Sequence, residues 1–132
     1  MKKVWTNGCY DILHVGHIKL FKYAKSLGDT LMVGVDSDSR VKELKGMSRP
    51  INNQYDRQEV LLSNQYVDEV VIFNSADDLR NLIKTNDIHT MVVGEEYRNK
   101  EVIGSEHCQE VMFFTKIKGL SSTQILDEIN GY

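Results

Sequence analysis

Long hydrophobic runs, proline and paired cysteines are all scarce in this sequence of 132 residues, which has one proline and two cysteines. Its apolar stretches reach only about five residues, as at Val70 to Phe73, whereas a membrane-spanning helix needs about 20. Cys9 and Cys108 stand far apart and form no CxxC pair, so neither a disulfide framework nor a zinc ribbon is expected. The first residues lack the apolar core and cleavage site of a signal peptide. We therefore expect a cytoplasmic protein with reduced thiols that does not enter a membrane.

The composition is that of an ordinary globular protein, with 41% apolar and 27% charged residues. A length of 132 residues corresponds to about one domain, so we expect residues 1–132 to form a single domain. Lys and Arg number 16 against 19 Asp and Glu, which gives a net charge of −3. This charge disfavours nucleic acid as a partner, because such proteins neutralise many phosphates with basic side chains. Small anions remain possible ligands of local basic clusters.

Strand-like apolar runs alternate with helix-like periodicity along the chain. The strands are expected at Val4–Thr6, Thr30–Val35, Glu69–Phe73, Thr90–Val93 and Val111–Phe114. The helices are expected around Ile18–Leu27 with Gly28 as the residue after the C-cap, from Asp36–Ser39 to about Lys45, from Gln54 to about Asn64, from Ser75–Asp78 to about Thr85, and from about Ser122. This alternation predicts an α/β fold with a Rossmann-like open parallel sheet of five strands and helices on both faces.

In an open parallel sheet, ligands bind beyond the carboxyl ends of the strands, so the functional residues are expected there. Three unusual segments follow predicted strands: residues 8–17, 94–97 and 116–123. They are expected to share one site. The first segment places His14 and His17 three residues apart at the start of a helix, on one face, with Gly16 between them. This arrangement suits a phosphate at a helix N-terminus; a zinc pair or two capping histidines are the alternatives.

The other two segments, and the crossover near the proline, carry charged and hydroxyl side chains. Residues 116–123 have two lysines, a glycine and three hydroxyl groups before a predicted helix, which favours a second anion-binding site. The alternative is an ordinary helix cap, because such hydroxyl residues cap helices in any protein. Arg57 has a fork of donors suited to phosphate. The pair Glu95 and Glu96 either holds a divalent ion or caps a turn. No nucleophile with an orienting base is recognisable and no Walker or GxGxxG motif occurs, so phosphoryl-type transfer without a covalent intermediate is favoured.

Residues 8–17 resemble the GxFDxxHxGH signature of the cytidylyltransferase-like nucleotidyltransferases, with Tyr10 in place of phenylalanine. Residues 119–123 resemble the family's second signature, so the resemblance spans nearly the whole chain. It implies an enzyme that joins a nucleoside triphosphate, with Mg²⁺, to a phosphorylated small molecule and releases pyrophosphate. The resemblance also implies a homodimer, because family members frequently dimerise.

The resemblance assigns a role to each residue of the predicted site. The catalytic residues are expected to be His14, His17, Lys45 and Arg57. The nucleotide is expected to be bound by Gly8, Cys9, Tyr10, Asp11, Gly16, Gly94, Glu95, Glu96, Lys116, Gly119, Leu120, Ser121, Ser122 and Thr123. The phosphorylated substrate is expected at Asp11, Lys45 and Arg49, and Glu96 is the candidate metal ligand.

Two branches of the family compete. The adenylyltransferase domain of ADP-heptose synthases is similar at residues 6–14, at the KGxSRPxN-like loop 45–52 and at residues 102–105, which predicts ATP and a sugar 1-phosphate such as heptose 1-phosphate. The GGDY-like segment of that branch is here Gly94 to Tyr97, with a longer acidic side chain at Glu96. Its usual sugar kinase partner domain does not fit in 132 residues.

Glycerol-3-phosphate cytidylyltransferases, which use CTP, are similar at residues 18–21, 24–29 and 67–70. Lys116 replaces an arginine that serves nucleotide binding there, which favours the heptose-type branch. A non-catalytic nucleotide-binding module and a zinc-dependent hydrolase using His14 and His17 are rivals from other classes.

Overall fold

The structure is a computed structural model that describes residues 1–115 and contains a five-stranded parallel sheet. The strand order is β3-β2-β1-β4-β5, and every neighbouring pair is parallel. This confirms the predicted fold class. The elements are β1 (Lys3–Gly8), α1 (Val15–Ser26), β2 (Thr30–Asp36), α2 (Asp38–Lys45), α3 (Gln54–Leu62), β3 (Glu69–Phe73), α4 (Ala76–Thr85), β4 (Thr90–Gly94), the 3-10 turns η1 (Glu95–Tyr97) and η2 (Ser105–His107), and β5 (Glu110–Phe114).

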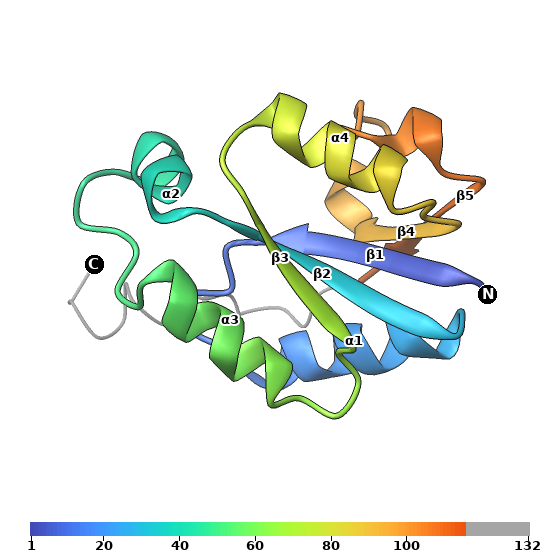
Figure 1. The fold of residues 1–132 in the computed structure, drawn as a ribbon, viewed down its shortest axis with the longest axis horizontal. Helices are drawn as coiled ribbons and strands as arrows, with labels where there is room; N and C mark the ends of the chain where they lie inside the picture. The colour runs from blue at the N-terminus through green and yellow to red at the C-terminus, as the bar shows by residue number, and fades with distance from the viewer. Residues whose placement is uncertain (116–132) are drawn as a thin grey trace.

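Helices cover both faces of the sheet, as Figure 1 shows. On one face α1 packs against β1 and β2, and α3 packs against β2 and β3, through a cluster that includes Phe21, Leu31 and Leu61, all fully buried. On the other face α4 packs through Leu79 and Ile83 against a cluster that includes Trp5. A sheet buried on both faces requires strands that are apolar throughout, which is why β2 reads as a continuous apolar run.

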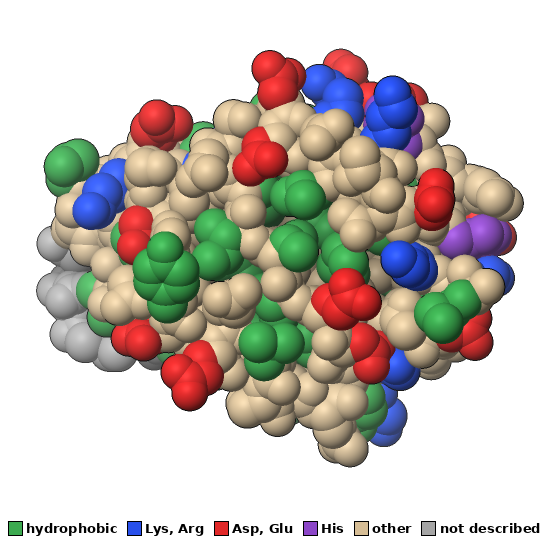
Figure 2. Space-filling view, viewed as in Figure 1, with side chains coloured by type: hydrophobic (Ala, Val, Ile, Leu, Met, Phe, Trp, Pro, Cys, Tyr) green, Lys and Arg blue, Asp and Glu red, His purple; other side chains and the backbone are tan. Residues whose placement is uncertain are grey.

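Most side chains of the edge strand β3 are half-buried. Figure 2 shows hydrophobic side chains along the middle of the face of the molecule that Figure 1 shows from the front. Acidic and basic side chains are interspersed around them. Among residues 1–115, no helix has the length and apolar character that a bilayer span requires.

Two details of the sequence prediction need correction. Helix α3 ends at Leu62 rather than Asn64, because the Asn64 side chain accepts a hydrogen bond from the Tyr66 backbone N–H and so stabilises a turn. Gly28 does follow the C-cap Leu27 of α1, but its backbone is not left-handed. A Cβ at Gly28 would lie 2.7 Å from the Lys2 carbonyl oxygen, so the glycine is needed for close approach of two segments. The predicted helix from Ser122 lies outside the described residues.

The chain order reverses between β1 and β4. It runs outward from β1 through β2 to β3, and then returns to the other side of β1 with β4 and β5. The carboxyl ends of β1 and β4 therefore flank the crevice where open α/β sheets bind ligands. The fold places Gly8 and Gly94, the last residues of these strands, at this crevice.

A side chain at Gly34 would collide with the indole of Trp5. A Cβ at this position would lie 2.8 Å from Cη2 of Trp5, which is fully buried in the sheet. We expect Gly34→Ala to lower the free energy of unfolding by about 1–3 kcal/mol, because the core must be overpacked to admit the methyl group. Urea denaturation measures this change.

The variant Trp5→Phe, whose side chain has a smaller ring, is the matched background in which Gly34→Ala is measured again. If the collision is with the indole, the penalty of Gly34→Ala falls by roughly 1 kcal/mol or more in that background, as coupled neighbours require. An equal penalty in both backgrounds would show that the collision lies elsewhere.

Candidate active site

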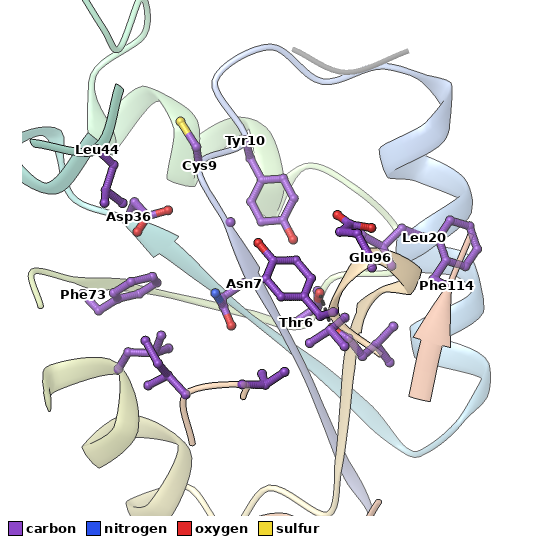
Figure 3. A pocket seen from close by; sticks show the side chains of 18 of the residues that line it. Thr6, Asn7, Cys9, Tyr10, Leu20, Asp36, Leu44, Phe73, Glu96 and Phe114 are labelled. Carbon is purple, nitrogen blue, oxygen red and sulfur yellow. Dashed lines mark hydrogen bonds between the residues drawn. The ribbon is translucent and has the colours of Figure 1, made fainter. Parts of the chain in front are cut away.

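A cavity of about 490 Å³ opens over the carboxyl ends of β1 to β4. It is lined by several predicted site residues: Gly8, Cys9, Tyr10, His17, Lys45, Gly94 and Glu96. Figure 3 shows that the cavity has two ends, with Glu96, Leu20 and Phe114 on one side of Thr6 and Asn7, and Asp36 and Phe73 on the other. The first end belongs to α1, β4 and β5 and the second to β2, β3 and α2.

The two histidines form a reciprocal cap at the start of α1. His14 is the N-cap residue, and its Nδ1 accepts a hydrogen bond from the Gly16 backbone N–H at 3.0 Å. The His14 backbone N–H donates in turn to Nδ1 of His17 at 3.2 Å, and the ring centroids lie 4.0 Å apart. Because each Nδ1 is an acceptor, the proton of each neutral imidazole is assigned to Nε2. The structure therefore confirms the capping alternative for both rings.

Tyr10 fixes the position of this pair. Its backbone has φ +51°, which is uncommon for a residue other than glycine and marks a strained turn. The turn directs the ring into the core, where it lies edge-on to two other rings. The ring centroid of Tyr10 is 5.4 Å from that of His17 and 5.3 Å from that of Phe21. Burial raises the pKa of the Tyr10 hydroxyl above its usual value, so the ring stays neutral. Tyr10 thus supports His17 and also lines the cavity.

Asp11 ties the histidine loop to the loop that contains the proline. Its carboxylate is fully buried and accepts hydrogen bonds from the backbone N–H groups of Ile51 and Asn52, both at 2.8 Å. Arg49 Nε lies 3.4 Å from the same carboxylate, and the Asn52 amide donates to the Asp11 carbonyl oxygen. Neither Asp11 nor Arg49 lines the cavity. Their geometry is that of residues that position the loop, and direct substrate contact by them stays a prediction.

Arg57 is also placed inside the protein. Its side chain is fully buried, and four of its five N–H donors are used by the protein. Nη1 donates to two carbonyl oxygens, those of Cys9 at 2.8 Å and Asp36 at 2.7 Å. Nε donates to the Asn52 carbonyl and Nη2 to the Asp38 carboxylate. At most one donor is left for a phosphate, which favours a positioning role over the predicted catalytic one.

Cys9 contributes its backbone, and its thiol is poorly suited to nucleophilic attack. Burial raises the pKa of the thiol, although Lys45 and Arg57 oppose the shift. The neutral thiol, which is a poor nucleophile, therefore dominates at neutral pH.

Lys45, at the end of α2, reaches the cavity from the β2 side. Near it lie Asp36 and Arg40, which sequence reasoning did not assign to the site. Arg40 Nε donates to the Asp36 carboxylate at 2.8 Å, and both residues line the cavity. The available signal was an aspartate at the end of a buried strand with an arginine four residues later.

On the β4 side, the two acidic residues Glu95 and Glu96 point to different places. Glu96 lines the cavity, and its carboxylate packs so closely over Gly94 that a Cβ there would displace it. Glu95 instead pairs with Arg98 on the surface, which lowers the pKa of its carboxyl group. Within residues 1–115, His, Cys, Asp and Glu side chains do not gather in threes as a metal centre requires. Glu96 as a metal ligand stays a prediction.

Some predicted site residues lie elsewhere. His14 and Gly16 belong to the cap behind His17, and only His17 of the pair lines the cavity. The predicted nucleotide-binding residues Lys116, Gly119, Leu120, Ser121, Ser122 and Thr123 lie outside the described residues. Their expected position opposite the histidines stays a prediction.

Comparisons with known proteins place this geometry in a family. Residues 5–128 match the family model described as cytidylyltransferase-like. The chain is similar to "Bifunctional protein HldE" of Campylobacter fetus, with 48% identity over 97% of this chain and 28% of that protein. The protein of the same name from a Nitratiruptor species is 48% identical over 96% of this chain and 27% of its own length. The chain thus spans about a quarter of these relatives.

Among solved structures, the fold is similar to that of a lipopolysaccharide core biosynthesis protein from Thermoplasma volcanium. The TM-score is 0.72 at 25% sequence identity, and the match covers 89% of this chain and 99% of that one.

Arg57→Ala tests the buried network. The change leaves three carbonyl oxygens and the Asp38 carboxylate without their donor. We expect a loss of about 3 kcal/mol in the free energy of unfolding, as for other broken buried pairs. Arg80→Ala is the control, because the Arg80 side chain is exposed and pairs with exposed acids, so it should cost less than about 1 kcal/mol. Equal losses in chemical denaturation would contradict the structural role of Arg57.

Proposed function

The chain belongs to the cytidylyltransferase-like family of nucleotidyltransferases, and from this premise we propose that it transfers a nucleoside monophosphate from an NTP to a phosphorylated small molecule. One observation carries the proposal: the capped histidine His17 of α1 and Lys45 at the end of α2 line the same cavity, at the crevice where the chain order reverses. Imidazole N–H and ammonium donors converging on one cavity suit the negative charge of a triphosphate.

The two ends of the cavity suit two substrates. The nucleotide occupies the end formed by α1, β4 and β5, and its phosphates extend toward the N-terminus of α1. The acceptor occupies the end formed by β2, β3 and α2. An acceptor phosphate oxygen forms a bond with the α-phosphorus while the bond to the β-phosphate bridge breaks, and pyrophosphate leaves. Nε2–H of His17 and the Lys45 ammonium stabilise the charge that develops on the phosphates, and His14 holds the His17 ring in place through the shared cap.

The nucleotide is proposed to enter as its Mg²⁺ complex, in which the ion neutralises part of the phosphate charge. Glu96 is the protein carboxylate proposed to lie nearest to it, because its side chain lines the nucleotide end of the cavity.

For the substrates, we favour ATP and a sugar 1-phosphate such as heptose 1-phosphate. The support is the resemblance of residues 6–14, 45–52 and 102–105 to the adenylyltransferase domain of ADP-heptose synthases. The first relatives share the name HldE, and the solved neighbour is named for lipopolysaccharide core biosynthesis. CTP with glycerol 3-phosphate is the alternative. Homodimer formation, a cytoplasmic location and the absence of a nucleic-acid partner also stay proposals.

Pyrophosphate release distinguishes the two substrate pairs. We expect release with ATP and heptose 1-phosphate in the presence of Mg²⁺, and little with CTP and glycerol 3-phosphate. ATP at 100 times its Kd should also stabilise the protein by about 2.7 kcal/mol in a thermal-shift measurement. Faster turnover with the CTP pair would reverse the substrate assignment, and no release with either pair would refute the transfer reaction.

His17→Asn separates the two uses of the His17 ring. The asparagine oxygen takes the place of Nδ1 and keeps the cap on the His14 backbone, but nothing replaces Nε2. We expect kcat to fall by about 100- to 1000-fold with nearly unchanged stability. Lys22→Ala, an exposed change on the same helix, is the control. A His17→Asn variant that retains half of the turnover would remove His17 from the mechanism.

A further inference from the structure

The acceptor end of the cavity holds an ion pair in a fixed orientation. Asp36 ends β2, and its side chain is 14% exposed, while that of Arg40, in the first turn of α2, is 17% exposed. Ser37 caps α2 by accepting from the Arg40 backbone N–H, which places the arginine one turn beyond the aspartate. The Arg40 guanidinium also lies over the Phe73 ring, 5.5 Å from its centre. The cap at Ser37 and the Phe73 ring therefore fix the position of Arg40, and the ion pair with Arg40 fixes the orientation of the Asp36 carboxylate.

Asn7 presents a donor to the same part of the cavity. The Trp5 indole N–H donates to Oδ1 of Asn7 at 2.9 Å, which fixes the amide orientation and leaves its NH₂ group as a donor. Figure 3 shows the Asn7 nitrogen turned toward the side of Asp36 and its oxygen turned away. An amide donor and a carboxylate acceptor thus face one space. A hydroxyl group fits between them, because it accepts one hydrogen bond and donates another.

The charges at this end also favour a hydroxyl over a phosphate. Asp36 and Arg40 neutralise each other, and a second anion beside the carboxylate would be repelled. Lys45, at the end of α2, supplies the positive charge for a phosphate. Phe73 and Leu79 add an apolar wall against which the C–H face of a sugar can pack.

We propose that Asp36 and Asn7 select the acceptor by hydrogen-bonding a hydroxyl group of its polyol, with Arg40 as the residue that positions Asp36. This inference rests on the proposed function and names how the same cavity chooses its acceptor. Burial raises the pKa of the Asp36 carboxyl, and the hydrogen bond from Arg40 opposes that shift. Arg40 thereby favours the ionised carboxylate, the form that accepts a hydrogen bond from a hydroxyl.

Asp36→Asn tests the proposal, because it keeps the shape of the side chain and removes its charge. The measurement is kcat/KM for heptose 1-phosphate divided by kcat/KM for propyl phosphate, which has no hydroxyl group on its carbon chain. We expect this ratio to fall by about tenfold, because the asparagine oxygen still accepts a hydrogen bond but a neutral acceptor binds the hydroxyl more weakly than a carboxylate. The KM for ATP should stay within about twofold, because ATP lies at the other end of the cavity.

Asp77→Asn is the matched control, since Asp77 lies on α4 with its side chain 98% exposed. Arg40→Gln is expected to lower the acceptor ratio as well, and Arg40→Lys to restore part of it by returning a positive charge near Asp36. A purely structural pair would lower thermal stability and leave the ratio unchanged.

The outcomes separate this inference from the proposed function. A wild-type protein that releases pyrophosphate but whose ratio is unchanged in Asp36→Asn overturns the role of Asp36 alone. A wild-type protein that releases none with any phosphorylated polyol overturns the proposed function, and the acceptor selection that rests on it.

Discussion

The buried guanidinium of Arg57 is the interaction on which the rest of the site depends. Its donors reach the Cys9 carbonyl in the histidine loop, the Asp36 carbonyl at the end of β2, the Asp38 carboxylate at the start of α2 and the Asn52 carbonyl after the proline. Asp36 and Asp38 are neighbours at the junction of β2 and α2, and Cys9 follows β1, which pairs with β2 in the sheet. Asn52 belongs to the proline loop, which no strand pairing joins to them, and Arg57 makes that connection. One side chain therefore holds the proline loop against the residues that follow β1 and β2, as a buried polar network can.

The sheet was predictable because its strands are apolar runs separated by capped helices, and periodicity reports burial directly. The partners of buried charges were not predictable in the same way. Nothing in the spacing of Asp11 and Arg57 distinguishes a side chain that faces a ligand from one that binds backbone groups of a distant segment, N–H groups for Asp11 and carbonyl oxygens for Arg57. The sequence thus located His17 and Lys45 at the cavity, but it could not show that Asp11 and Arg57 support the cavity from behind. Arg40 was missed because an arginine four residues after an aspartate usually signals only a solvated helix face.

The sequence also left open whether the histidines cap a helix or bind a ligand, and the geometry shows that the two roles are compatible. A neutral imidazole has one acceptor and one donor nitrogen. The cap uses the acceptor Nδ1 of both rings, and this use fixes which nitrogen carries the proton. Capping therefore orients the His17 ring toward the cavity with its proton on Nε2, and the His14 ring, tilted by 31° against it, holds it there. A histidine pair that served only as a cap would show the same contacts, so the distinction rests on the cavity that His17 lines.

A protein with a net charge of −3 needs a local arrangement to attract a triphosphate. Among the described residues, three arginines around the crossover are each matched by an aspartate: Arg40 by Asp36, Arg49 by Asp11 and Arg57 by Asp38. Each aspartate cancels most of the positive potential of its arginine. These arginines therefore shape the cavity without attracting an anion to themselves. The attraction that remains comes from Lys45 and the N-terminus of α1, which approach the cavity from different sides. This is the reason for proposing that the polyphosphate lies in the space between them, over the end of β1.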